Sequence, residues 1–275
     1  MTRKQILERN TKETLKNLRF NQKSTIKGLL SDLEKVKQEI TMKLKDVKRF
    51  EMGYYRNILR GIDEKIDEYT RKMNGNILSS RDYAFNQGSS LMPSILKDIG
   101  YSYTFGKLSD ELIAVSKNYA IDVIKNMGSE MKDDVAREIR KSLLKGDNTF
   151  DTARKIDEII GVNKDFGYMN RADKIARTEI NSAYSLSKHL RDEETLEILP
   201  DMKRIWVTGF NPRDKDMGGG RGFISHLEAD GQIRDIDEPF DVGGEKLMYP
   251  GDMNASPENR INCNCHEENY MPGWR

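Results

Sequence analysis

The sequence contains few cysteines, little proline and no long apolar run. Cys263 and Cys265 are its 2 cysteines among 275 residues, and one residue separates them. A disulfide bond between such close neighbours is strained, and a single disulfide bond cannot stabilise a fold of this length. No disulfide framework is therefore expected. Because no run of 18 apolar residues exists and the N-terminus is polar, we expect neither a membrane span nor a signal peptide. These absences favour a soluble protein made in a reducing cytoplasm.

Proline is also absent from residues 1–74, which are rich in Lys, Glu, Leu and Ile. Apolar residues recur there in steps of three, four and seven, the period of an amphipathic helix. We predict a long helix or a helical hairpin, a break at residues 74–76, and a loop-rich stretch over residues 79–94. The stripe is narrow, so we expect a partner molecule to cover it. It begins with Leu15, Leu18, Ile26, Leu29, Leu33, Ile40 and Leu44.

A second helical block is predicted between residues 101 and 192. Its boundaries follow from polar residues that cap helix starts and from glycines that end helices. The expected boundary residues are Ser109 and Gly146 for one segment, Thr149 or Asp151 and Gly161 for a short helix, and about Asp165 and Asp192 for the last.

After Pro200 the sequence becomes rich in glycine, proline and aspartate. Residues 203–208 alternate in the manner of a strand, and brief strands or ordered loops are expected at 223–224, 232–233 and 246–249. We therefore predict an α+β fold, with a long basic helical arm over residues 1–100 and a small turn-rich α+β domain over residues 101–275. Within that domain, helices are expected over 101–192 and a small sheet with loops over 203–275.

Charge is distributed unevenly along the chain, although the net charge is only +1. Residues 1–75 hold 19 lysines and arginines against 11 acidic residues, whereas residues 190–275 hold 10 against 18. The basic end is expected to favour anionic partners. Three interpretations stay open: a solvated helix face, contact with packaged duplex DNA, or contact with an acidic protein surface. The basic residues singled out are Lys12, Lys16, Arg19, Lys23 and Lys27.

Seven short motifs occur in a fixed order in the last hundred residues. They are Ile175 to Glu179 (IARTE), Trp206 with Thr208, Arg221 to His226, Asp230-Gly231-Gln232, Pro239-Phe240, Tyr249 to Asp252 (YPGD), and Asn262 to Cys265 (NCNC). This order resembles the MuF-type domain of minor head (head morphogenesis) proteins of tailed bacteriophages, over about residues 135–266. The chain departs from the pattern in the glycine-rich loop over residues 211–222.

The resemblance implies a minor structural protein of a phage head, without enzymatic activity. It implies a place at the portal vertex or capsid interior of the virion, after synthesis in the host bacterial cytoplasm. The expected partners are the portal protein, other head proteins and packaged double-stranded DNA, with no membrane contact during assembly. The expected role is to assist procapsid assembly, DNA packaging or DNA delivery.

The motif residues also have a structural interpretation. Arg177 and Glu179 lie two apart on a helix and face different sides, so each needs its own partner. Arg177 fits either a surface ion pair or a buried bidentate pair with a carboxylate of the following sheet. Trp206 is expected in the core. Turn chemistry explains a further group of motif residues, Asp230, Gly231 and Asp252, and Asn262 belongs to the terminal motif.

A cluster of nitrogen and sulfur ligands is the one candidate cofactor site. His226, Cys263, Cys265 and His266 are residue types that zinc prefers, and His189 at the end of a helix is a further candidate ligand. A structural zinc ion would cross-link the loops of a small domain and so stabilise its fold. The alternative is that the cysteines are small buried apolar side chains beside a hydrogen-bonded His226.

Known catalytic signatures are missing from the sequence. The GGGRG segment lacks the Lys-Ser/Thr of a phosphate-binding loop, and no paired-carboxylate or H-E-x-x-H motif occurs. Two rival functions remain: a non-specific DNA-binding protein, and a metal-dependent hydrolase that uses His226, Cys263 and Cys265.

Overall fold

The computed structural model describes residues 1–45, 52–161, 167–209 and 226–274, and it divides into two compact units. The sheet unit consists of Met1–Lys23, Ser79–Ser116 and Arg177–Arg275. The helical unit consists of Ser24–Leu78 and Lys117–Ala176. Each unit combines segments from both sides of residue 100, so the units do not coincide with the expected division into residues 1–100 and 101–275. Packing between distant segments, which the order along the chain does not reveal, defines them.

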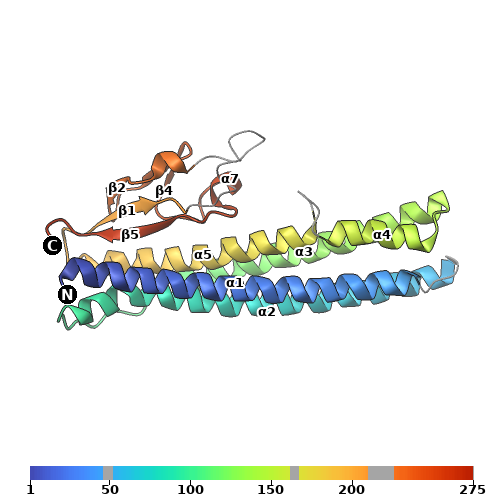
Figure 1. Ribbon diagram of the computed structural model, residues 1–275, viewed down its shortest axis with the longest axis horizontal. Coiled ribbons are helices and arrows are strands. Elements are labelled where there is room, and N and C mark those ends of the chain that lie inside the picture. Colours follow the sequence, from blue (N-terminus) through green and yellow to red (C-terminus); the bar gives the residue numbers. More distant parts are fainter. Residues whose placement is uncertain (46–51, 162–166, 210–225, 275) are drawn as a thin grey trace. The chain divides into compact units, whose positions relative to one another are not determined.

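Long helices dominate the described residues (Figure 1). They are α1 (Arg3–Lys45), α2 (Met52–Asp98), α3 (Asp110–Lys145) and α5 (Tyr168–Thr195), with the shorter α4 (Thr149–Ile160) between the last two. The small antiparallel strands all follow α5, which confirms the predicted α+β class. Within the described ranges, no helix has both the length and the apolar character that crossing a membrane requires.

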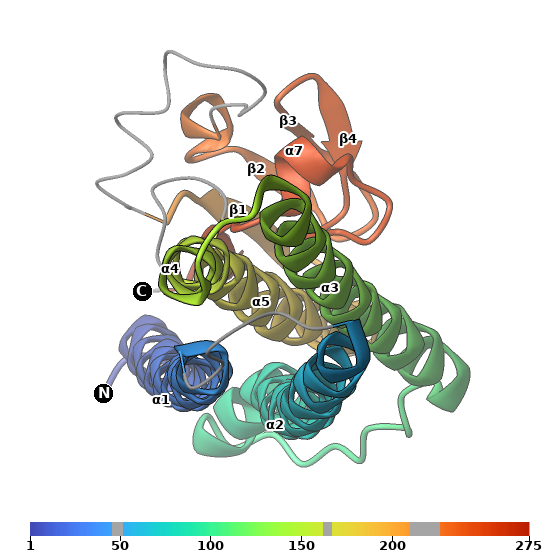
Figure 2. The same cartoon turned by 90° about the vertical axis from the view of Figure 1, so that its right-hand side faces the viewer.

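From Ile26 onward, the apolar stripe that we expected a partner molecule to cover lies in the core of the helical unit, while Leu15 and Leu18 pack in a small core of the sheet unit. Figure 2 looks along the helices that surround this core. Leu33, Ile40 and Leu44 of α1 are 0% exposed, because α2, α3, α4 and the start of α5 supply the opposing faces. The expectation of an outside partner for this stripe was therefore wrong. Periodicity shows that one face of a helix is apolar, but it does not show which segment covers that face.

Helix α2 corrects two expectations, since it runs without interruption through the predicted break at 74–76 and the predicted loop over 79–94. Ile77, Ala84, Leu91 and Ile95 are all buried, and their spacing places them on one helix face. Gly88 lies on the same stretch, where an added Cβ would be 2.4 Å from the backbone oxygen of Tyr184. This packing outweighs the weak helix propensity of the serines and glycines.

Helix ends were predicted more accurately than helix interiors. The Ser109 hydroxyl accepts a hydrogen bond from the backbone N–H of Leu112 at 3.3 Å, as expected of the residue preceding α3. Gly146 follows α3 with a φ of +70°, a conformation that favours glycine. The cap of α4 is Asn148, whose side chain accepts from the Asp151 backbone N–H at 2.8 Å, rather than Thr149 or Asp151. Gly161 ends α4 as predicted.

The sheet unit contains a three-stranded antiparallel sheet in the order β2-β1-β5. Strand β1 (Lys203–Val207) confirms the strand predicted over 203–208, and it pairs with β2 (Ile233–Asp235) and β5 (His266–Tyr270). A separate hairpin joins β3 (Phe240–Val242) to β4 (Glu245–Leu247). A 3-10 turn, η1 (Leu227–Ala229), precedes β2, and a single helical turn, α7 (Pro257–Arg260), precedes β5.

Two small apolar cores support this sheet. One contains Trp206, which is 0% exposed as predicted, together with Phe240, Val242 and both cysteines. The other joins the end of α2 to Met202, Ile236 and other side chains of the sheet region. The expected glycine-rich loop at 211–222 and the strand at 223–224 lie outside the described residues.

Candidate functional site

The sheet unit brings together three of the four predicted metal-ligating residues. His226 immediately precedes η1, while Cys263 and Cys265 lie between α7 and β5. The His226 Nδ1 atom is 3.5 Å from Cys263 Sγ and 3.4 Å from Cys265 Sγ, and the candidate ligand atoms all lie within 4.8 Å of one another. Both cysteines are buried and His226 is partly buried. Side chains separated by 37 residues along the chain therefore share one small site.

Neighbouring groups hold these three side chains in place. The His226 Nε2 atom is 3.1 Å from Asn259 Oδ1, and the His226 ring meets the Trp206 ring edge-on with 6.0 Å between centroids. Hydrogen bonding with Cys263 and with His226, helped by the Gly209 backbone N–H, lowers the pKa of the Cys265 thiol to about 5 although burial opposes this. A thiol with so low a pKa is present as thiolate near neutral pH.

This donor set suits a metal ion. Thiolates and a neutral imidazole are ligands of soft and borderline divalent ions, of which zinc is the commonest in structural sites. Such sites also have outer contacts that orient the ligands, and Asn259 and Gly209 provide them here. The three residues therefore form a cluster that can hold a metal ion.

His266 does not join the cluster, which corrects the predicted four-residue set. Its Nε2 atom lies 3.3 Å from Glu268 Oε1, two residues along β5. Alternate side chains of a strand share a face, so His266 and Glu268 lie on one face of β5, whereas Cys265 precedes the strand. The further candidate, His189, contacts Arg204 at 3.2 Å instead.

Two contributors to the site were missed from the sequence. Asn259 lies in the one-turn helix α7, and Gly209 follows β1. Neither has a spacing or motif relation to the cysteines, so no sequence signal could have indicated them. An added Cβ at Gly209 would lie 2.0 Å from the backbone oxygen of Asn264, which explains why this position is glycine.

Glu179 of the IARTE motif lies at the centre of a buried ion-pair cluster. Its Oε2 atom is 2.5 Å from Arg81 Nη1, and its Oε1 atom is 2.9 Å from Arg260 Nη2. All three side chains are at most 6% exposed. Burial lowers the pKa of Arg81, and the negative charge of Glu179 opposes that shift. Arg177, which was expected to be a candidate for such a pair, is only partly buried.

Two hydrogen bonds join α5, at the IARTE motif and one turn after it, to the two later motifs. Thr178 Oγ1 accepts a hydrogen bond from the Asn262 backbone N–H at 2.9 Å. One turn further along α5, Ser182 Oγ donates to the backbone oxygen of Gly251 at 2.9 Å. Asn262 has a φ of +59°, a left-handed conformation that asparagine tolerates better than most residues. Motifs separated by about 70 to 85 residues are therefore parts of one packed interface.

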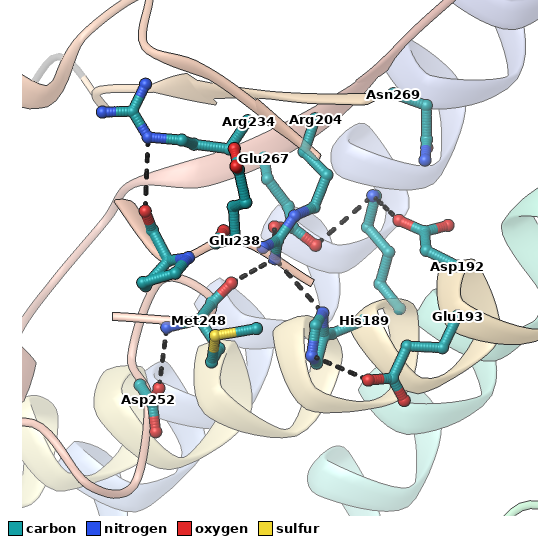
Figure 3. A network of polar contacts seen from close by, with 12 residues as sticks. His189, Asp192, Glu193, Arg204, Arg234, Glu238, Met248, Asp252, Glu267 and Asn269 are labelled. Carbon is teal, nitrogen blue, oxygen red and sulfur yellow. Dashed lines mark hydrogen bonds and ion pairs between the residues drawn. The ribbon is translucent and has the colours of Figure 1, made fainter. Parts of the chain in front are cut away.

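A second buried polar network joins α5 to the sheet (Figure 3). Lys188 Nζ lies 2.5 Å from Asp192 Oδ2 and 3.4 Å from Glu267 Oε1, while Arg204 Nη1 lies 3.2 Å from Glu267 Oε2. These four side chains are at most 1% exposed. Burial, with the positive charge of Arg204, lowers the pKa of His189 to about 4, so its ring is neutral near pH 7. Such a network fixes how the sheet packs on α5.

The remaining motif residues form turns. Asp230 Oδ1 accepts from the Thr208 backbone N–H at 2.7 Å, and Gly231 has a φ of +78°. Asp252 is 2% exposed, and its two carboxylate oxygens accept from the backbone N–H groups of Met248 and Asn254, each at 2.9 Å. The predicted turn chemistry is confirmed at both places.

The five basic residues singled out in α1 share one exposed helix edge. Their spacing of three or four residues places them in a row about 22 Å long. All five side chains are exposed, and none makes an ion pair within the part of the chain that the structure describes. Other lysines of the first two helices are neutralised, such as Lys35 by Asp32 and Lys72 by Glu68. The row consists of Lys12, Lys16, Arg19, Lys23 and Lys27, and we call it the basic row.

Comparison of the sequence with protein-family models and with curated proteins finds no match, and comparison of the fold with solved structures finds none.

Proposed function

We propose that this chain is a minor structural protein of a tailed-bacteriophage or prophage head. It binds at the portal vertex or capsid interior and assists procapsid assembly, DNA packaging or DNA delivery. The proposal rests on the order of the seven MuF-like motifs in the sequence. Its partners are the portal protein and other head proteins.

One structural observation supports this proposal most strongly. Thr178 of the IARTE motif contacts the NCNC motif, and Ser182, one turn after IARTE on the same helix, contacts the YPGD motif. Motifs that lie in separate turns and never touch are not expected to occur in a fixed order in a sequence. Motifs that pack against one another in a single interface are. The motifs therefore contribute to the packing of one compact unit, as expected if their order marks one type of fold.

We also infer a non-enzymatic role. The charged motif residue Glu179 is buried between two arginines, and Asp252 accepts two backbone hydrogen bonds. Carboxylates committed to buried partners in this way hold the structure together. The rival metal-dependent hydrolase would have to act through the His226 cluster alone.

The portal complex is the direct test of the proposed function. The chain is co-expressed with the portal protein of the same phage or prophage, and the two are purified through a tag on the portal. We expect a complex with few copies of this chain per portal ring, whereas the portal of an unrelated phage should not retain it. A monomer that neither portal nor procapsid retains would contradict the proposal.

We propose further that the cluster holds a structural zinc ion. Its three ligands, His226, Cys263 and Cys265, would join the start of η1 to the start of β5. In a small core with few apolar side chains, the free energy of binding the ion adds directly to the stability of the folded state. A chain that binds zinc but hydrolyses no substrate would support the structural site over the rival hydrolase.

Elemental analysis and cobalt substitution test the zinc proposal. We expect one zinc ion per chain and a thiolate-to-cobalt absorption band in the cobalt form. Cys263→Ser, Cys265→Ser and His226→Ala should each lose the ion, while His266→Ala is the matched control and should keep it. A wild-type chain that binds neither metal stoichiometrically contradicts the proposal. Nuclease activity that disappears in His226→Ala would favour the hydrolase.

The basic row favours contact with packaged duplex DNA as a second activity of the same protein. Five exposed cations that have no acidic partner among the residues the structure describes form a surface that attracts phosphates and releases counterions on binding. This contact would be non-specific, since a single row of long flexible cations has no groups placed to recognise base edges.

A further inference from the structure

Both nitrogen atoms of the His226 ring have contacts in the site. Nδ1 lies 3.5 Å from Cys263 Sγ and 3.4 Å from Cys265 Sγ, while Nε2 lies 3.1 Å from Asn259 Oδ1. A neutral imidazole carries one proton, on one nitrogen or the other. Only the nitrogen without the proton can bind a metal ion, so the position of this proton decides whether His226 faces the thiolates as a ligand.

The orientation of the Asn259 amide settles that position. Its Nδ2 atom donates to the backbone oxygen of Val242 at 3.4 Å, so its Oδ1 atom faces His226. An amide oxygen can only accept, so the proton in this contact lies on His226 Nε2. Nδ1 then faces the two sulfur atoms: while it carries a second proton it can donate to the Cys265 thiolate, and once that proton is lost its lone pair can bind a metal ion.

Asn259 is itself held firmly. Its side chain is 0% exposed, and its backbone N–H donates to the Ser256 oxygen at 3.1 Å within α7. The next residue, Arg260, donates to Glu179 in the buried ion-pair cluster. The turn that carries Asn259 is thus anchored at both ends before the chain reaches Cys263, so the amide cannot easily rotate away from His226.

We propose that Asn259 is the positioning residue of the metal site: it fixes the Nε2–H tautomer of His226 and so presents Nδ1 to the ion held with Cys263 and Cys265. This inference rests on the proposed zinc site and deepens it. Metal-ligating histidines generally donate their second N–H to such a partner, and removal of the partner lowers metal affinity by about 10- to 100-fold.

The tautomer can be measured in the metal-free chain. Nitrogen-15 spectra of the side chains distinguish Nε2–H from Nδ1–H, and the chain has only 3 histidines to assign. We expect Nε2 of His226 to carry a proton in the wild type, whereas in Asn259→Ala the Nδ1–H form beside the Cys265 thiolate should gain population at its expense. The matched control is Asn254→Ala, at an exposed asparagine of the same segment, which should leave the spectrum unchanged.

Zinc affinity, measured by competition with a chromophoric chelator, provides the second readout. Asn259→Ala should bind zinc about 10- to 100-fold more weakly than wild type. Asn259→Asp keeps an acceptor for Nε2–H but loses the donor to Val242, so it should retain the tautomer and the zinc affinity while lowering the thermal midpoint. A role in stability alone predicts instead that both variants lose affinity in proportion to their loss of stability.

The outcomes separate the two proposals. A wild-type chain that binds no zinc overturns the zinc site, and the tautomer spectra then still test Asn259 independently. A wild-type chain that binds zinc while Asn259→Ala binds it equally well, with an unchanged tautomer, overturns the role of Asn259 and leaves the zinc site standing.

Discussion

At the scale of single residues, Glu179 shows how a motif residue can be structural. Its carboxylate faces the guanidinium groups of Arg81 and Arg260, and all three side chains are buried. Taking charges out of water is costly, and their mutual attraction offsets that cost only while the set is complete. Arg81 also donates to the Ser116 backbone oxygen at 3.1 Å, so the cluster joins α2, α3, α5 and α7 within the sheet unit.

We expect Glu179→Gln to lower the free energy of unfolding by about 3–5 kcal/mol, because it leaves two buried arginines without a counter-charge. Urea denaturation followed by circular dichroism measures the change. Glu13→Gln, at an exposed glutamate of α1, is the control and should change stability by no more than about 0.5 kcal/mol. Equal effects of the two substitutions would show that the cluster does not stabilise the fold.

At the scale of secondary-structure elements, α2 contains glycines with opposite roles. Gly88 lies where α2 meets α5, and an added Cβ there would be 2.2 Å from Ser187 Oγ and 2.4 Å from the Tyr184 backbone oxygen. Gly75 has no atom within 4 Å of an added Cβ. The first glycine permits close packing of two helices, while the second only weakens the helix by its conformational freedom.

The same substitution should therefore change stability in opposite directions at the two positions. We expect Gly88→Ala to lower the free energy of unfolding by about 1–3 kcal/mol through overpacking against backbone atoms. Gly75→Ala should raise it by about 0.5–1 kcal/mol, because alanine is the better helix former. Thermal and urea denaturation of the two variants and the wild type provide the measurement. Stabilisation by both substitutions would mean that α2 and α5 do not approach closely at Gly88.

At the scale of the whole molecule, charge is unevenly distributed along the sequence, and the predicted apolar stripe of α1 is buried within the chain. An assembly partner has to bind exposed surface, which carries many charged side chains but also apolar ones such as Phe20, Leu112 and Leu144. The basic row is the part of that surface with the clearest chemistry. Its cations are exposed and have no acidic partners among the described residues.

We expect weak, salt-sensitive binding to random duplex DNA through the basic row. Replacing Lys12, Lys16 and Lys23 by glutamine should weaken binding at low salt. It should also reduce the slope of log affinity against log salt by about 1 for each DNA phosphate that the variant no longer neutralises. Fluorescence anisotropy at several salt concentrations measures both quantities.

The control for this experiment replaces lysines that already have acidic partners. Lys35, Lys65 and Lys72 pair with Asp32, Glu39 and Glu68. Their replacement by glutamine makes the same change in net charge and should affect binding less. Affinity that persists at physiological salt would favour a dedicated DNA-binding protein, and equal weakening in the two triple variants would show that net charge alone drives binding.

The sequence by itself determined the local features of this protein. Periodic apolar residues predicted the helices, Ser109 and Gly146 predicted the ends of α3, and alternation predicted β1 with Trp206 in the core. These features depend on neighbours within a few residues, so short stretches of sequence are enough to indicate them.

Only the tertiary structure decided which distant segments meet. Arg81 reaches Glu179 across 98 residues, His266 contacts Glu268, and Asn259 contacts His226. Packing also made the predicted loop over residues 79–94 part of α2 and covered the stripe that we expected an outside partner to cover. The physical reason is that an apolar or charged side chain specifies the kind of partner it needs, while the partner itself is chosen by the packing of the whole chain.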